Sequence, residues 1–185
     1  MAGRFVCLSL MAAMLWTGFS PDSFAQSAPV KAVPRVDLDL YSGTWYEIAA
    51  FPAVFQPADC TGTTATYTLN VDGSIKVWNQ CYQPTASGVD QLLRIEGRAV
   101  PANAGKSQLK VSFFGPFAGD YWVLDLDDNY ETALVGTPDR RFLWILHRDP
   151  QLDAKTYARL LALAQQQGFD TQKLRRTPPR GQRFE

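Results

Sequence analysis

Residues 63–82, TTATYTLNVDGSIKVWNQCY, decide the fold class. In both halves of this segment polar residues alternate with larger or apolar ones, which is the two-residue period of a β-strand with one buried face. The turn residues Val71-Asp72-Gly73 separate the halves, so the segment predicts two strands. The odd-numbered residues of both strands face the interior, and Trp78 is an apolar exception on the outer face.

Short runs of the same kind continue on both sides of this segment. They recur at spacings near ten residues, and clusters rich in Gly, Pro, Asn and Asp separate them. This pattern predicts an all-β antiparallel sandwich or barrel rather than alternating βαβ units. The expected strands are 45–51, 63–70, 74–82, 92–100, 108–114, 121–127, 132–136 and 142–148.

A helical period replaces the strand period after Pro150. Between Asp153 and the stop signal Gly168, apolar residues recur at helical spacing, at Tyr157, Leu160, Leu161 and Ala164. This spacing predicts one amphipathic α-helix. Its apolar stripe would cover an outer wall of the sheet, where the outward side chains of Tyr46, Ile48 or Trp78 need cover.

Composition limits the classes of function. The chain has 185 residues, enough for one ordinary domain, and 18 basic residues balance 18 acidic ones. A neutral chain without a basic run lacks the charge pattern of a nucleic-acid binder. One histidine and three cysteines supply few zinc ligands, so we expect no metal site and no cofactor.

The two ends of the chain differ from the middle. Residues 1–25 predict a cleaved signal peptide, because the apolar stretch 5–19 is shorter than the roughly 20 residues of a spanning helix. No lipoprotein box precedes Cys7, so we expect export to the periplasm without a lipid anchor.

We expect residues 26–36 to form a linker and residues 37–176 to form the folded domain. The arginines and prolines after residue 174 lack an apolar period, so we expect residues 177–185 to be disordered.

Cys60 and Cys81 remain after the signal peptide is removed. An even number of cysteines in an oxidising compartment predicts a disulfide bond between them. Two free buried thiols and one reactive thiol are the alternatives.

Three motifs stand out: GTWYEI at 43–48, VSFFGPF at 111–117 and LWILHR at 143–148, with a turn from Asp128 to Tyr130 before the last one. In this order they resemble the motifs of the lipocalin family, and within it those of the bacterial and apolipoprotein D-like members. The resemblance covers residues 37–176. It implies an eight-stranded antiparallel up-and-down β-barrel, or calyx, with one C-terminal α-helix packed outside and room for one small ligand.

The resemblance also assigns the two ends of the barrel. It implies that Gly43 and Trp45 pack with Arg148 at the closed end, where a guanidinium over an indole gains about 1 kcal/mol. Cys60 and Cys81 then fall at the open end, where their bond would hold the first loop beside the mouth. Alternation points Cys60 outward and Cys81 inward, so the bond requires a bulge near Gly62.

The resemblance implies a fatty acid or lysophospholipid as the ligand, held in an apolar interior. A twelve-carbon chain would contribute roughly 10 kcal/mol before the entropy of binding is subtracted. Asn79 is the one polar inward residue of its strand, and it faces either a ligand or a bonding partner in the core. The expected lipid-binding residues are Tyr67, Val77, Asn79, Ile95, Phe113, Tyr121 and Trp144.

Phenylalanines gather where the mouth is expected, at Phe51, Phe55, Phe114 and Phe117. Such a cluster is typical of a lid, of the surface of a homodimer, or of a patch that contacts the outer membrane. Alternation also places Glu47 on the inner face, beside Trp45, and leaves its role open.

Three other functions fit parts of the sequence. An enzyme could use Cys81 as a nucleophile, but a disulfide would remove the thiol and no base is placed to activate it. A haem protein could use His147, although alternation points this side chain outward. A barrel filled by its own side chains could dock a partner or a membrane through the mouth. We expect a non-enzymatic lipid carrier.

Overall fold

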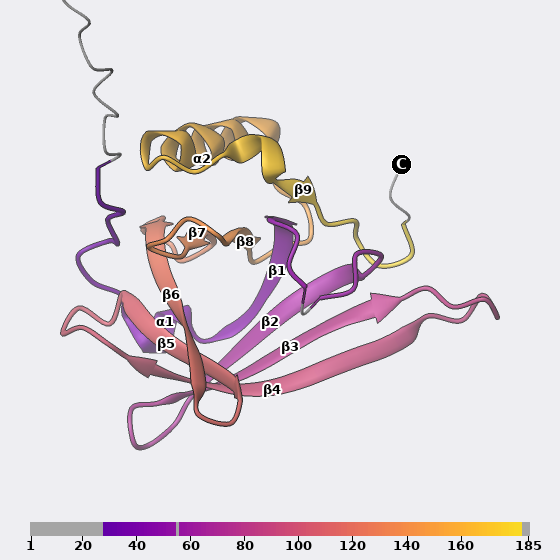
Figure 1. The fold of residues 1–185 in the computed structure, drawn as a ribbon, viewed down its shortest axis with the longest axis horizontal. Helices are drawn as coiled ribbons and strands as arrows, with labels where there is room; N and C mark the ends of the chain where they lie inside the picture. The colour runs from indigo at the N-terminus through magenta and orange to yellow at the C-terminus, as the bar shows by residue number, and fades with distance from the viewer. Residues whose placement is uncertain (1–27, 55, 183–185) are drawn as a thin grey trace, which may run out of the picture.

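The computed structural model describes residues 28–54 and 56–182, and these form one closed antiparallel barrel with a helix outside it (Figure 1). The expected eight-stranded up-and-down barrel is therefore confirmed. The predicted signal peptide lies outside the described residues. The elements are α1 (Leu38–Tyr41), β1 (Gly43–Ala50), β2 (Thr61–Leu69), β3 (Ile75–Gln83), β4 (Gln91–Pro101), β5 (Gln108–Phe114), β6 (Phe117–Leu126), β7 (Thr132–Gly136), β8 (Leu143–His147), α2 (Ala154–Gln166), a 3-10 turn η1 (Thr171–Lys173) and a two-residue strand β9 (Arg175–Arg176).

The barrel closes through β1, which pairs with a different strand along each half. Its first half, Gly43 to Tyr46, pairs with β2, and its second half, Tyr46 to Ala50, pairs with β8. The two halves of the opening hairpin pair as their alternation predicts, with Tyr67 opposite Val77 and Ala65 opposite Asn79. The inward residues of all eight strands therefore converge on one interior.

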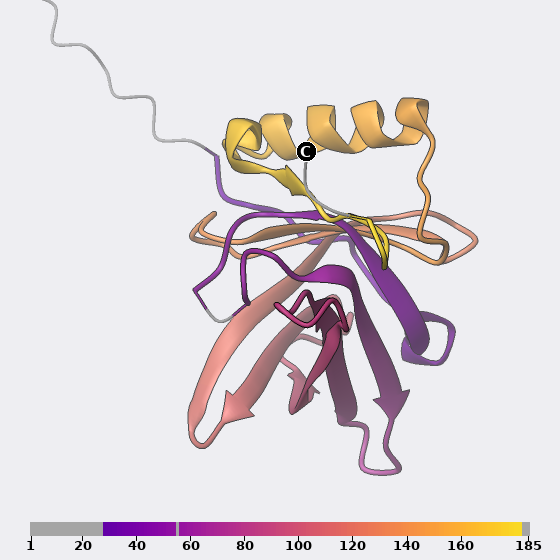
Figure 2. The ribbon, with the colours of Figure 1, turned by 90° about the vertical axis from the view of Figure 1, so that its right-hand side faces the viewer.

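Helix α2 covers the outer wall formed by β1, β7 and β8 (Figure 2). Asp153 caps it, because its side chain accepts a hydrogen bond of 2.9 Å from the Thr156 amide. Leu160 and Ala164 pack against a second core that includes Ile48. Trp78 is not part of that core: it lies beneath the cations of Lys76 and Arg94, at 5.6 and 5.3 Å from its ring centre.

A bulge between Glu47 and Ala49 reverses the alternation of β1. One extra residue on a strand moves every later side chain to the opposite face. Phe51 consequently points outward, where it is buried and packs on Phe169 with ring centres 6.4 Å apart. The expectation that Phe51 lies at the mouth is wrong for this reason.

The C-terminal segment is ordered as far as residue 182, so the expectation of disorder is wrong for residues 177–182. β9 pairs with Ala49 and Ala50, along the half of β1 that β2 leaves free. Beyond it the Thr177 amide donates to the Ile48 carbonyl at 3.0 Å, and the Gly62 amide donates to the Pro178 carbonyl at 2.8 Å. The segment therefore bridges the place where β1 and β2 separate, and residues 183–185 lie outside the described residues.

Part of the N-terminal linker also packs on the barrel. Val30 and Val36 are buried, and the Val33 amide donates to the Val123 carbonyl at 2.8 Å. Lys31 is fixed at its backbone, because its amide and carbonyl both bond the side chain of Gln167 at the end of α2.

Arg148 closes the end of the barrel opposite the mouth. Its guanidinium carbon lies 3.9 Å from the ring centre of Trp45, which is fully buried. Gly43 has a φ of 96°, and a Cβ there would lie 3.2 Å from Nη1 of Arg148. The guanidinium also donates hydrogen bonds of 2.9–3.2 Å to the carbonyls of Leu40, Tyr41, Ser42, Thr44 and Tyr130.

Candidate functional site

The barrel encloses a cavity of about 660 Å³. This volume lies within the range of small-molecule sites, and most of the lining is apolar. A barrel filled by its own side chains, one of the alternatives, does not leave such a volume. The structure brings all seven expected lipid-binding residues to this cavity: Tyr67, Val77, Asn79, Ile95, Phe113, Tyr121 and Trp144.

Three tyrosines are linked near the closed end. The hydroxyl of Tyr121 lies 2.7 Å from that of Tyr41 and 3.0 Å from that of Tyr67. Burial raises the pKa of Tyr67 to about 12 and that of the other two well above 10.0, so all three stay protonated at neutral pH. The hydroxyls of Tyr67 and Tyr121, two of the expected lipid-binding residues, are therefore hydrogen-bonded to each other.

Asn79 lines the cavity, but its side-chain oxygen is not exposed to it. The Oδ1 atom is buried and accepts no hydrogen bond, and Thr64 Oγ1 is the other such buried atom within residues 28–54 and 56–182. A buried acceptor without a donor costs about 1–3 kcal/mol. The structure therefore shows no core partner for this oxygen, and contact between Asn79 and a ligand stays a prediction.

Glu47 also lies on the cavity wall, as alternation predicts, and only 9% of it is exposed. Its Oε1 atom accepts from Thr177 Oγ1 at 2.6 Å and from Gln56 Nε2 at 3.2 Å. Burial raises the pKa of this carboxyl above 4.5, and the two hydrogen bonds oppose part of that rise. Both partners come from segments without a strand period, so no sequence signal identified them.

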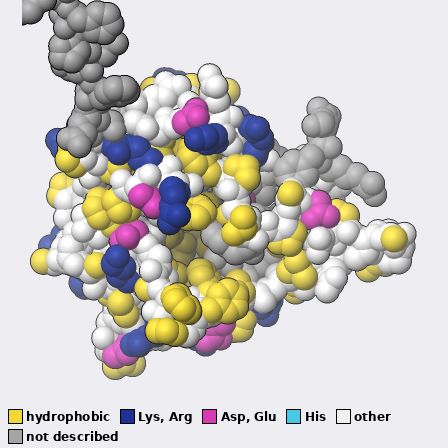
Figure 3. All heavy atoms as spheres, in the orientation of Figure 1, with side chains coloured by type: hydrophobic (Ala, Val, Ile, Leu, Met, Phe, Trp, Pro, Cys, Tyr) yellow, Lys and Arg dark blue, Asp and Glu magenta, His cyan; other side chains and the backbone are white. Residues whose placement is uncertain are grey.

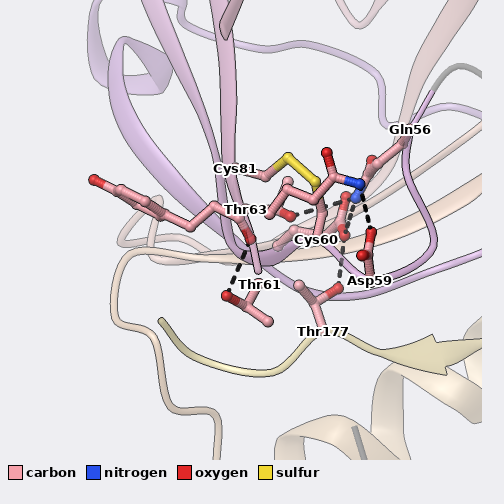
Figure 4. Close-up of a disulfide and its surroundings, with 10 residues drawn as sticks. Gln56, Asp59, Cys60, Thr61, Thr63, Cys81 and Thr177 are labelled. Carbon is pink, nitrogen blue, oxygen red and sulfur yellow. Dashed lines mark hydrogen bonds between the residues drawn. A yellow bond between two sulfur atoms is a disulfide. The ribbon is translucent and has the colours of Figure 1, made fainter. Parts of the chain in front are cut away.

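The disulfide Cys60–Cys81 lies near Gln56 and Thr177, the two partners of Glu47 (Figure 4). The required bulge is present between Thr61 and Thr64, where Gly62 has a φ of 57°. Asp59 accepts a hydrogen bond of 3.0 Å from Gln83, so the first loop is held to β3 twice. The predicted disulfide is confirmed, and it removes the thiol that the enzyme hypothesis needs.

His147 lies outside the barrel. Its Nδ1 atom is 2.7 Å from the Glu131 carbonyl and 2.9 Å from Thr132 Oγ1. The alternation of the strand predicted this outward position correctly. The histidine that the haem hypothesis requires therefore does not lie in the cavity. In the described part of the chain, no cluster of three His, Cys, Asp or Glu side chains could hold a metal ion.

The open end carries exposed apolar side chains. Phe114 and Phe117 are 66% and 79% exposed at the β5–β6 turn, and Val54 and Val89 stand on neighbouring loops. Figure 3 shows hydrophobic side chains gathered on this part of the surface beside a hollow. Phe55 lies outside the described residues. No helix within the described ranges is both long and apolar enough to cross a bilayer.

Known proteins share both the sequence and the fold. A family model described as a lipocalin-like domain matches residues 36–179. Temperature-induced lipocalin-1 of Arabidopsis thaliana is 41% identical over 158 residues, covering 80% of this chain and 82% of that protein. The outer membrane lipoprotein Blc of Escherichia coli K12 is 43% identical over 145 residues, covering 78% and 80%.

A more distant relative matches in sequence, and a solved structure matches in fold. Mouse apolipoprotein D is 31% identical over 159 residues, covering 82% of this chain and 80% of that protein. The structure of insecticyanin from Manduca sexta matches with a TM-score of 0.61 and 24% identity, covering 80% of this chain and 83% of that chain. The chain belongs to the lipocalin family.

Proposed function

We propose that this lipocalin binds one fatty acid or lysophospholipid inside its barrel and transports or stores it in the bacterial envelope for membrane maintenance. The observation that carries the proposal is the mostly apolar cavity of about 660 Å³ in the barrel. An apolar site with few polar groups suits an acyl chain that needs one or two orienting hydrogen bonds. The confirmed disulfide supports a non-enzymatic carrier, because it occupies the candidate nucleophile.

The affinity of such a site can be bounded. A chain of about twelve buried methylenes contributes roughly 10 kcal/mol, and association costs at least about 4 kcal/mol. The difference of about 6 kcal/mol corresponds to a Kd of tens of micromolar, and each orienting hydrogen bond tightens it further. Micromolar binding of a single-chain lipid is the expected result.

The envelope location has separate support. Relatives at 36–43% identity are outer membrane lipoproteins, and residues 1–25 predict export to the periplasm. Phe114 and Phe117 would contact the outer membrane while a lipid enters or leaves the mouth.

Titration of the delipidated mature protein with lysophospholipid tests the binding step. Trp144 lines the cavity and serves as the fluorescent reporter, and we expect saturation at one lipid per chain. Calorimetry on Ile95→Trp, which fills the cavity, should show affinity reduced about tenfold or more.

Val100→Trp is the matched control, because Val100 lies on the same strand but is exposed outside. Equal affinity of both variants, or no saturation of the parent protein, would contradict binding inside the barrel.

A further inference from the structure

We propose that Glu47 forms a polar subsite that selects lipids carrying a protonated amine over lipids that end in a carboxylate. The inference deepens the proposed function and rests on it, because it names which class of single-chain lipid the same cavity prefers. One carboxylate oxygen without a donor, on β1 in the cavity wall, carries the argument.

Glu47 has one oxygen in use and one free. Both of its hydrogen bonds end on Oε1, one from the first loop and one from the C-terminal segment. No hydrogen bond or ion pair formed by the described residues reaches Oε2. The carboxyl is thus fixed in orientation by Gln56 and Thr177, with its second oxygen unpaired.

The neighbouring cations are already engaged. Arg141, which lines the cavity, pairs with Asp139 at 2.5 Å. Arg94 lines it too, but donates to Gln80 at 3.0 Å and lies over the Trp78 ring.

Two further charged groups near this wall have partners of their own. Asp120 pairs with Lys110 at 2.7 Å, and Arg176 on β9 lies over the Tyr157 ring. Among the residues that the structure describes, no cation forms an ion pair with Glu47.

A ligand that carries donors completes this subsite. An ammonium has three N–H donors and a positive charge, so it can pair with Glu47 and donate to its free oxygen. A carboxylate has no donor, and beside Glu47 it places two like charges in an apolar space. Charge-assisted hydrogen bonds of about 1.5–3 kcal/mol correspond to roughly a tenfold to hundredfold preference for the amine.

Three single-chain probes of equal length test the proposal on the delipidated mature protein: dodecylamine, dodecanol and dodecanoate. Near neutral pH we expect dodecylamine to bind about tenfold or more tightly than dodecanoate. Glu47→Gln should abolish most of this ratio while Gln still accepts from Thr177.

Glu96→Gln is the control, because it removes the same charge from an exposed position on β4 and should leave the ratio unchanged. Equal affinity for amine and carboxylate, or an unchanged ratio in Glu47→Gln, would overturn the subsite. Failure of all three probes, dodecanol included, would instead overturn the proposed function.

A second pair of ligands identifies the source of the amine. Lysophosphatidylethanolamine differs from lysophosphatidic acid of the same chain by its ethanolamine group. Tighter binding of the former assigns the subsite to phospholipid head groups. A preference confined to dodecylamine assigns it to simple long-chain amines.

Discussion

Replacement of Arg148 tests how the closed end is held together. Its five hydrogen bonds reach three consecutive carbonyls at the end of α1 and two carbonyls on neighbouring segments. Its planar face also covers the buried Trp45 ring at 3.9 Å. Arg148→Met keeps the aliphatic stem and removes every donor, whereas Arg148→Lys keeps the charge and removes the planar fork.

The expected loss follows from these contacts. Arg148 is partly exposed, so water can replace some of its donors, and each lost bond costs about 0.5–1 kcal/mol. Five bonds and about 1 kcal/mol from the ring contact give roughly 3.5–6 kcal/mol for Arg148→Met. A lysine ammonium can form some of these hydrogen bonds, but it cannot reach all of the carbonyls that the planar guanidinium reaches. Arg148→Lys should therefore lower the free energy of unfolding by about 2–3 kcal/mol.

Urea unfolding with the disulfide intact measures both losses, and thermal unfolding should show Tm falling by about 10–15 °C for Arg148→Met. A loss below about 1 kcal/mol for Arg148→Met would refute the inference that this arginine holds the closed end. If Arg148→Lys had the same free energy of unfolding as the parent protein, the positive charge alone would be enough to hold the closed end.

Three further changes have expected outcomes. Joint replacement of Cys60 and Cys81 by serine should cost about 3 kcal/mol in urea unfolding, because the bond spans 21 residues, and an unchanged midpoint would contradict this. Glu47→Gln should unfold at the same urea concentration as the parent near pH 4 but at a higher one near pH 8. Burial favours the protonated form of this carboxyl, so the folded protein loses stability as the pH rises through the raised pKa and the carboxyl ionises. The same difference in midpoint between the two proteins at both pH values would exclude this cause. Phe114→Ser with Phe117→Ser should weaken co-sedimentation with anionic vesicles about tenfold, and undiminished binding would place membrane contact elsewhere.

The two-residue period predicted most of the barrel, because each strand has one face toward a single interior. It placed Glu47 and Asn79 inward and His147 outward, and together with the cysteines it required the bulge near Gly62. Phe51 was misplaced because the bulge in β1 depends on how β8 and β9 pair with it, which the alternation within β1 does not encode.

The partners of Glu47 were unpredictable for a related reason. Thr177 lies 130 residues away in a segment rich in arginine and proline, and its order comes from bonds to β1 and β2 rather than from its own pattern. Arg180 over the Tyr82 ring, at 3.9 Å, is a contact of the same kind. Local composition predicts disorder for this segment, because the hydrogen bonds that order it are formed with residues far away in the sequence.

Native mass spectrometry of the mature protein, purified from the envelope without detergent, tests lipid carriage most directly. We expect one single-chain lipid per protein molecule in the parent and a much smaller bound fraction in Ile95→Trp, which fills the cavity. A parent protein that carries no lipid, and takes up none when lysophospholipid is added, would contradict the claim that the barrel is a lipid carrier.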